Sequence, residues 1–434
     1  MAIAWGSDRR VFDVGEAPKA QPSGSNRRVS KRPSLAEVRP QSARLYPADG
    51  CVSVTTERDL QALEPLWREL HSEASDASPF RSWDFTVEWL RHFVLGRAGD
   101  ATGRFEIVLA FDAHCRLIGA AAMFEERSFG SDALGLLLQP FGRSRSFETM
   151  TDEPIVLLRR GQEEKAAQAL AQHIVARVAT VGWDLAVVPG APQLDASGKR
   201  SVAWPRPLDS VQVTRPVAGI LSLDLPRRWE AFTAGLSKSM RDNIAYYPRR
   251  LTREMGKWTI RTARSPSEIA LATEHLIDLH NCRSRATTGV AHRSHIASAR
   301  QASFLRSWFA RAAIRSEISI ISVEVGGEVA AAQAFVEMPG CIAVYYSGFD
   351  ERYHRYSPLT IITAHLIRSA IERGVRRLEF PPGPTAWKSR WGATGAAMND
   401  EVSIYATRLP ALIRGVSRRL RLQWQFSMAR LAPA

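Results

Sequence analysis

The residues best suited to chemistry in this sequence surround Ser357 and Pro358, where a helix is predicted to begin. Serine is favoured just before a helix, and proline fits the first turn because its missing N–H would be unpaired there anyway. The free N–H groups and positive dipole end of such a helix form a natural phosphate site. The preceding loop adds Arg352, His354 and Arg355. By itself the segment favours a plain strand–helix–strand crossover, and a phosphate site is the alternative.

Two predicted strands position this helix start. The strand before it ends in the aromatic run YYSGFD at residues 345–350, and the strand after it contains LEF at residues 378–380. Apolar side chains recur along one face of the intervening helix, at Leu359, Ile362, Leu366, Ala370 and Ile371. Gly374 is placed to end the helix ahead of the second strand.

The order strand, strand, helix, strand occurs twice, at a separation of roughly 200 residues. The first copy has a hairpin in residues 105–126 and a helix with a strand in residues 163–188. The second copy has a hairpin in residues 318–338, with Gly326-Gly327 as its turn, and a helix with a strand in residues 358–380. Gly182 ends the first helix as Gly374 ends the second. The repeat predicts a duplicated lobe, and the alternative is two unrelated α/β domains that both contain hairpins.

The predicted fold class is α/β (α+β), with two tandem lobes that are each a mixed, twisted sheet flanked by helices. Residues 1–48 are rich in Pro, Ser, Arg and Lys and predict a disordered basic arm. Order is expected to begin with a strand at residues 51–56 and a helix at residues 59–74. Proline and turn residues place the boundary between the lobes near residues 205–225. The expected domains are an N-terminal lobe at residues 49–215, a C-terminal lobe at residues 216–408 and a basic amphipathic C-terminal helix at residues 409–434.

Composition excludes several classes of protein. The chain has 434 residues and is 45% hydrophobic, which is enough to bury the cores of two or three domains. No apolar run approaches the ~18 residues that span a membrane, and the N-terminus does not read as a secretory signal. Four cysteines without a CxxC pair indicate free thiols of a reducing compartment, so we expect a cytoplasmic protein. The one close histidine pair, His292 and His295, has no cysteine or carboxylate cluster beside it, and no metal is expected.

The formal net charge of +14 is partly local. Residues 236–264 carry eight Lys or Arg against two acids, and residues 410–434 carry five Arg and no acid. No zinc finger, aromatic RNA-binding strand or basic zipper accompanies these segments, so no specific nucleic-acid partner is expected. The basic C-terminal helix either lies on an anionic membrane surface or packs across a lobe with its arginines outward, and we favour the second interpretation. The oligomeric state is open.

The whole arrangement resembles the acetyl-CoA-binding core of the GNAT acyltransferases. The closer resemblance is to the tandem-lobed branch of that superfamily, the CelD/BcsL-type and FemAB-like acetyltransferases. It covers roughly residues 50–408 and is strongest in residues 235–395. The matching positions in the second lobe are Tyr345, Tyr346, Gly348, Phe349, Asp350, Ser357, Pro358, Lys388 and Trp391.

The resemblance implies acetyl-CoA or another acyl-CoA as co-substrate, without a metal. In the superfamily the fourth and fifth strands splay apart, and the pyrophosphate of CoA sits on amides at the start of the intervening helix. The implied cofactor-binding residues are Ser347, Gly348, Arg352, Arg355, Ser357, Leu359 and Thr360. The glycine-rich phosphate loop of typical members is absent, and Leu359 follows Ser-Pro where members often have glycine. Pyrophosphate binding would therefore depend on the helix end and on basic side chains.

The implied reaction is direct acyl transfer from a thioester to an amine. It needs a neutral amine, a hydrogen bond to the developing oxyanion and a proton for the leaving thiolate. Asp350 would accept the amine proton, and Tyr346 or Tyr353 would protonate the thiolate. The alternatives are structural: a turn cap for Asp350, and tyrosines that only pack. The candidate substrate-binding residues are Glu379, Lys388, Trp391 and Arg241, which could instead be an edge carboxylate, packing residues and a solvated helix face.

The leading hypothesis is an acyl-CoA-dependent N-acyltransferase that acts on an amino sugar, a polysaccharide precursor or another small amine. A FemAB-like enzyme with an aminoacyl-tRNA donor is the second. The third is a catalytically silent GNAT-fold protein that binds a partner in polysaccharide biosynthesis. The absence of the glycine-rich phosphate loop supports this third hypothesis. No GxSxG elbow or Walker loop points to another reaction class.

Overall fold

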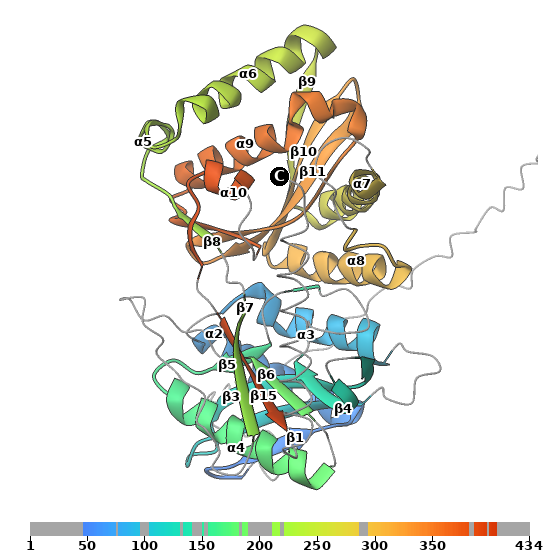
Figure 1. Ribbon diagram of the computed structural model, residues 1–434, viewed down its shortest axis with the longest axis vertical. Coiled ribbons are helices and arrows are strands. Elements are labelled where there is room, and N and C mark those ends of the chain that lie inside the picture. Colours follow the sequence, from blue (N-terminus) through green and yellow to red (C-terminus); the bar gives the residue numbers. More distant parts are fainter. Residues whose placement is uncertain are drawn as a thin grey trace, which may run out of the picture. The chain divides into compact units, whose positions relative to one another are not determined.

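The computed structural model describes residues 47–74, 77–95, 104–130, 133–140, 150–151, 155–181, 185–189, 211–217, 221–285, 294–381, 386–396 and 399–405. Almost all of the predicted basic arm (1–48) and the whole predicted C-terminal helix (409–434) lie outside these ranges. The described residues form two sheets flanked by helices, as predicted (Figure 1). No helix in this part of the chain is long and apolar enough to cross a membrane.

The first sheet has the strand order β1-β2-β3-β4-β6-β15-β7, and β5 also pairs with β3. Its strands are β1 (Cys51–Val54), β2 (Phe105–Phe111), β3 (Leu117–Gly130), β4 (Ala133–Pro140), β5 (Val156–Leu158), β6 (Leu185–Pro189), β7 (Val211–Val217) and β15 (Asn399–Tyr405). The helices of this first lobe are α1 (Glu57–Gln61), α2 (Glu64–Glu73), the short 3₁₀ helix η2 (Pro79–Arg81), α3 (Trp83–Leu90), the π-helical turn η3 (Arg91–Leu95) and α4 (Glu163–Val181).

The second sheet has the order β14-β8-β13-β12-β11-β10-β9. Its strands are β8 (Leu221–Asp224), β9 (Trp258–Ala263), β10 (Ile318–Val325), β11 (Glu328–Met338), β12 (Cys341–Phe349), β13 (Arg377–Phe380) and β14 (Thr394–Ala396). The helices of this second lobe are α5 (Trp229–Ala234), α6 (Lys238–Met255), α7 (Pro266–Arg285), α8 (Ala299–Ile314), the 3₁₀ helix η4 (Glu351–Tyr356), α9 (Pro358–Glu372) and α10 (Ala386–Arg390).

The predicted repeat is present in the pairing of both sheets. In the first lobe β2, β3 and β4 are antiparallel, and β4 then pairs in parallel with β6 across helix α4. In the second lobe β10, β11 and β12 are antiparallel, and β12 pairs in parallel with β13 across helix α9. Gly326 and Gly327 both have positive φ in the β10–β11 turn, and Gly374 has φ 75° after α9, as the sequence predicted. Gly182 lies outside the described residues.

Two expectations from the sequence were wrong. The single helix expected at residues 59–74 is two helices, α1 and α2, and Pro65 stands in the first turn of the second one, where it cannot continue the hydrogen bonding of the first. Strand β15 was expected in the second lobe (216–408), but it pairs with β6 and β7 of the first sheet. Its pairing covers the edge of β6, which would otherwise present unpaired backbone groups.

Helices cover the two faces of the second sheet with different apolar clusters. Side chains of α7 and α8 pack with one face of the sheet and with α3 of the first lobe, around the fully buried Trp308. Side chains of α9 pack on the opposite face, together with α5 and α6. Alternation along β12 places Ile342 and Val344 in the α9 cluster, and Ala343 in the α7 cluster. The two faces of β12 are therefore covered by different helices.

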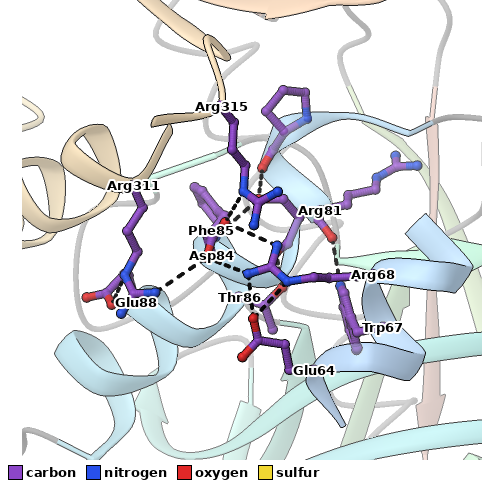
Figure 2. A network of polar contacts seen from close by, with 12 residues as sticks. Glu64, Trp67, Arg68, Arg81, Asp84, Phe85, Thr86, Glu88, Arg311 and Arg315 are labelled. Atoms are coloured by element: carbon purple, nitrogen blue, oxygen red, sulfur yellow. Dashed lines mark hydrogen bonds and ion pairs between the residues drawn. The ribbon is translucent and has the colours of Figure 1, made fainter. Parts of the chain in front are cut away.

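An ion network around two buried acids joins α3 of the first lobe to α8 of the second (Figure 2). Asp84, which is 3% exposed, accepts hydrogen bonds from Arg68 of α2 at 3.0 Å and from Arg315, just after α8, at 2.8 Å. One helical turn further on, the carboxylate of Glu88 pairs with Arg311 of α8 at 2.9 Å. The two acids and the two arginines are each spaced by four residues, about one helical turn, so Asp84 lies opposite Arg315 and Glu88 lies opposite Arg311. This network fixes the register of the two helices.

Candidate functional site

The two central strands of the second sheet part beside the start of α9. Strands β12 and β13 pair only over Cys341–Ala343 and Arg377–Glu379. On the other side of β12, Val344 faces Phe335 and Ser347 faces Gln333, so that two tyrosines stand opposite the single residue Ala334. This is a β-bulge, in which the extra residue is left out of the ladder. The described strands thus splay where the bulge occurs, which leaves backbone groups of β12 available to a ligand.

The start of α9 differs from the prediction in one respect. Ser357 precedes the helix, but its side chain makes no capping hydrogen bond. Its backbone is left-handed, at φ 46° and ψ 55°, whereas a side-chain cap normally needs extended backbone. The Ser357 carbonyl instead accepts the amides of Thr360 at 2.9 Å and Ile361 at 3.3 Å. Pro358 stands in the first turn as expected, and Leu359 beside it lies where a helix amide has no intrahelical acceptor.

Two arginines and one carboxylate flank this helix start. Arg250 of α6 donates to the carbonyl of Arg355 at 3.3 Å, and its guanidinium lies 5.6 Å from the centre of the Tyr356 ring. Arg355 donates to the Tyr356 hydroxyl at 2.6 Å. Glu254 pairs with both arginines, and the hydrogen bond from Arg250 is the main reason that its pKa is lowered. The first turn of α9 itself contains no acid, so the helix start carries a net positive charge.

Asp350 and Arg352 form a separate pair at the end of β12. Asp350 accepts the amide of Arg352 at 2.9 Å and also binds its guanidinium, which reaches Glu328 at 2.9 Å. The hydrogen bond from Arg352 lowers the pKa of Asp350, so this carboxylate has a weak affinity for a proton. Tyr353 is buried, with the Arg352 guanidinium 5.6 Å from its ring centre. Asp350 therefore caps the turn after β12, and Arg352 points to Glu328 at the start of β11 rather than to the start of α9.

The end of β12 is held from the α7 side. His280 lies with Nδ1 2.9 Å from the carbonyl oxygen of Ser347, and its Nε2 accepts the amide of His295 at 3.1 Å. Both contacts are satisfied by the neutral ring with its proton on Nδ1, and burial lowers the pKa of His280 to about 4. Arg283, one turn later, donates to Ser347 Oγ at 2.9 Å. The helix therefore fixes both the backbone and the side chain of Ser347.

Gly348 permits this close packing. A Cβ atom on Gly348 would lie 2.2 Å from the backbone nitrogen of His280 and 2.6 Å from the carbonyl oxygen of Leu279. Only glycine fits such an approach of two backbones. Gly348 therefore sets the distance between β12 and α7 at this point.

The two bulge tyrosines face the first lobe. The Tyr345 hydroxyl donates to the carbonyl of Met150, and its ring lies 5.2 Å from that of Phe80. Tyr346 is half-buried, with its ring centre 5.4 Å from His280, and its hydroxyl is 4.0 Å from the Met150 sulfur. The first lobe thus contributes side chains to the surroundings of the bulge.

The four predicted substrate-binding residues each have a local partner. Glu379 pairs with Arg377 at 3.3 Å, and Arg241 donates to the carbonyl of Leu236. Lys388 is 4% exposed and donates to the carbonyl of Pro381 at 2.5 Å. Trp391 is buried in the α9-side cluster. Their assignment to substrate stays a prediction, while Lys388 and Trp391 close the end of β13.

Sequence reasoning missed His280 and Arg283. The signal available was their spacing of three residues in LHNCRSR, which places both side chains on one face of α7. Their partner Ser347 lies 67 and 64 residues away, a contact that no local pattern shows. Among the described residues, no group of three His, Cys, Asp or Glu is arranged to hold a metal ion.

Residues 238–389 match the model of the acetyltransferase (GNAT) domain family. Among solved structures, FemX has a TM-score of 0.52 at 7% identity, and the match covers 84% of this chain and 100% of FemX. A conserved protein of unknown function from Bacteroides thetaiotaomicron has a TM-score of 0.47 at 9% identity, over 82% of this chain and 100% of that one. A tandem GNAT protein from the clavulanic acid biosynthesis pathway has a TM-score of 0.41 at 12% identity, over 82% and 99%. No curated protein matches the sequence.

Proposed function

We propose that this chain, a GNAT-superfamily acyltransferase with two tandem lobes, transfers an acyl group from acyl-CoA to an amine. The acyl group we propose is acetyl, and the acceptor is an amino sugar, a polysaccharide precursor or another small amine. The observation that carries this proposal is the parting of β12 from β13, at a bulge, beside the start of α9.

The donor fits this arrangement through its charge and shape. A thioester arm needs an extended groove lined by backbone groups, and the splay of β12 provides such groups. A pyrophosphate needs positive charge, which the first turn of α9 supplies through the amides near Leu359 and the dipole. Arg250 and Arg355 stand at this turn and would exchange Glu254 for the phosphate oxygens. The missing glycine-rich loop is thus offset by side chains of α6 and η4.

The reaction forms a C–N bond between the acceptor amine and the acyl carbon and breaks the C–S bond of the thioester. We assign the oxyanion contact to the backbone at the bulge, because an amide released from the ladder there can donate to it. Tyr346 is our candidate acid for the thiolate, since it stands at the bulge and is half-buried, whereas Tyr353 is buried under Arg352. The proton of the amine goes to water or to Asp350, which is a weak base in its pair with Arg352.

Release of free thiol from acetyl-CoA in the presence of small amines tests this proposal. Thr360 lies in the first turn of α9 and is partly exposed, so Thr360→Glu would place a negative charge where the pyrophosphate binds. We expect the KM of this variant for acetyl-CoA to rise at least tenfold, which corresponds to about 1.4 kcal/mol of binding free energy. Thr360→Gln should keep nearly the wild-type KM. No thiol release with any amine, or equal KM values for the two variants, would count against the proposal.

The same assay separates the two other functions raised by the sequence. The resemblance of the sequence to FemAB-like enzymes makes an aminoacyl-tRNA the second candidate donor. Transfer of a labelled aminoacyl group from tRNA, without thiol release from acetyl-CoA, would favour that donor. A silent binding protein would bind acetyl-CoA or an amine with no turnover.

A further inference from the structure

Arg283 on α7 is a half-buried cation that has no acidic partner in the part of the chain that the structure describes. Its guanidinium donates to Ser347 Oγ at 2.9 Å and lies 5.6 Å from the centre of the Phe349 ring. Among the described residues it forms no ion pair, and the eight residues that follow α7's last residue, 286–293, contain no Asp or Glu. Burial lowers the pKa of Arg283.

Three other arginines around the second sheet have acidic partners. Arg250 pairs with Glu254, Arg352 with Asp350, and Arg373 with Glu337 at 3.2 Å, although each is more accessible than a core residue. A buried charge normally needs such a partner, because its removal from water is costly. Arg283 differs from these three arginines because it is half-buried and has no acidic partner among the described residues, whereas Arg241 and Arg285, which also lack one, are exposed.

The surroundings of Arg283 are neutral but polar. His280, one turn earlier, holds its proton on Nδ1 for the Ser347 carbonyl and stays uncharged near neutral pH. The hydrogen bond from Arg283 to Ser347 Oγ uses one of five N–H donors, so the flat guanidinium keeps donors for a second partner. A planar guanidinium binds carboxylate and phosphate through two parallel hydrogen bonds.

The position of Arg283 favours contact with the acceptor rather than with the phosphates of the donor. It contacts Ser347, the residue directly after the bulge, from the face that α7 covers. The start of α9, which suits the pyrophosphate, belongs to the opposite face of the sheet. An anion bound by Arg283 therefore sits near the reacting carbonyl and away from the helix start.

We propose that Arg283 is a specificity-determining residue that binds a carboxylate or phosphate group of the acceptor amine. This inference rests on the proposed function and names its substrate class: a compact acceptor whose anionic group lies a few bonds from the nucleophilic nitrogen, such as an amino acid or a phosphorylated amino sugar. Binding the anion would compensate the buried charge and orient the amine toward the bulge.

Matched acceptor pairs test the inference, with thiol release from acetyl-CoA as the readout. One pair is glucosamine 6-phosphate and glucosamine, and the other is L-alanine and L-alaninamide. We expect kcat/KM for the anionic member of at least one pair to exceed that of its neutral partner tenfold or more. Arg283→Gln should remove this preference by raising the KM for the anionic acceptor, and Arg283→Lys should keep part of it. Arg285→Gln is the control, because Arg285 is exposed on the same helix and donates to the Asn281 carbonyl.

Binding of acetyl-CoA, measured by calorimetry, shows that each variant is folded and keeps the donor site. Equal kcat/KM for both members of each pair, with acetyl-CoA bound, would overturn the inference and leave the proposed function standing. The same holds if Arg283→Gln keeps the preference. A preference for succinyl-CoA over acetyl-CoA that Arg283→Gln removes would move the anion to the donor and overturn the assignment to the acceptor. Absence of acetyl-CoA binding to the wild type would overturn the proposed function and this inference with it.

Discussion

The two lobes share an order of strands and a crossover helix, but differ at the two features that would serve a donor. Strand β12 has a bulge against β11, whereas β4 pairs with β3 over eight consecutive residues without a register shift. Helix α9 begins with Pro358, Leu359 and Thr360, whereas α4 begins with Glu163 and Glu164. Acids in the first turn occupy the positive end of the dipole and repel phosphate.

The two lobes therefore share a fold, and in the described residues the bulge and the helix start without acids both occur in the second lobe. The first lobe keeps the sheet and the helix and serves as a support, since Phe80 and Met150 contact Tyr345 of the bulge. Its α3 also carries the acids that hold α8. A change that targets the bulge, the link between lobes or the helix starts should therefore affect the lobes unequally.

Gly348→Ala should have the largest effect. The added methyl group would meet the backbone of α7 at 2.2 Å, so β12 and α7 must move apart. We expect a loss of at least about 3 kcal/mol in the free energy of unfolding, at the upper end of overpacking costs, and loss of thiol release. Urea unfolding measures it. Gly235→Ala is the control, because its new Cβ would meet nothing closer than 3.5 Å. An equal loss of stability in both variants would contradict the claim that the close packing of β12 and α7 requires glycine at position 348.

Asp84→Asn breaks the ion network that joins the lobes. The substitution removes the charge that compensates Arg68 and Arg315, and we expect about 2–3 kcal/mol of destabilisation in thermal unfolding. Glu274→Gln should cost less than about 1 kcal/mol, because its pair with Arg306 is exposed. Burial alone would raise the pKa of Asp84, but the hydrogen bonds from the two arginines lower it overall. Its contribution is therefore present at neutral pH and lost as the pH falls through that lowered pKa.

His280 gives the second lobe a pH dependence of its own. Its pKa is lowered by burial from 6.5 to about 4, so between these values the unfolded chain binds a proton that the folded chain does not. Stability should fall by about 2–3 kcal/mol from this group as the pH drops from 6.5 to 4. His280→Asn should flatten the dependence, measured by urea unfolding at pH 7 and pH 4.5. If His280→Asn and the exposed control His354→Asn keep the same slope, the buried neutral ring is not its source.

The smallest effect is expected at the start of α4. Replacing Glu163 and Glu164 with Gln removes the acids from the first turn of the first lobe's helix. Because β4 has no bulge, neutralising the turn should not create a donor site, and the KM for acetyl-CoA should stay within twofold of wild type. A second class of acetyl-CoA sites in this variant would show that the acids alone silence the first lobe.

Local signals in the sequence were sufficient for the repeat. Gly326-Gly327 adopts the positive φ values of a tight hairpin, Gly374 ends α9, and Pro358 opens it, because each depends on backbone preferences of one or two residues. The left-handed Ser357 was not predictable in this way, since it depends on η4 arriving from the end of β12. The pairing of β15 with β6 was not predictable either, because it joins residues more than 200 positions apart in the sequence.

The candidate site was predictable only in outline. The sequence placed Tyr346, Ser347 and Gly348 at a strand end, which is where they lie. It could not show that α7 contacts Ser347 through His280 and Arg283, since these contacts join residues more than 60 positions apart. It also could not show that Arg352 turns to Glu328 or that Lys388 is buried, because both depend on which surfaces the fold brings together.

A calorimetric titration with acetyl-CoA shows whether the donor binds to one of the two similar lobes. We predict one site per chain for the wild type and a tenfold or greater loss of affinity for Thr360→Glu, with Thr360→Gln unchanged. Two equivalent sites per chain, or one site that Thr360→Glu leaves intact, would contradict the assignment of the donor to the start of α9.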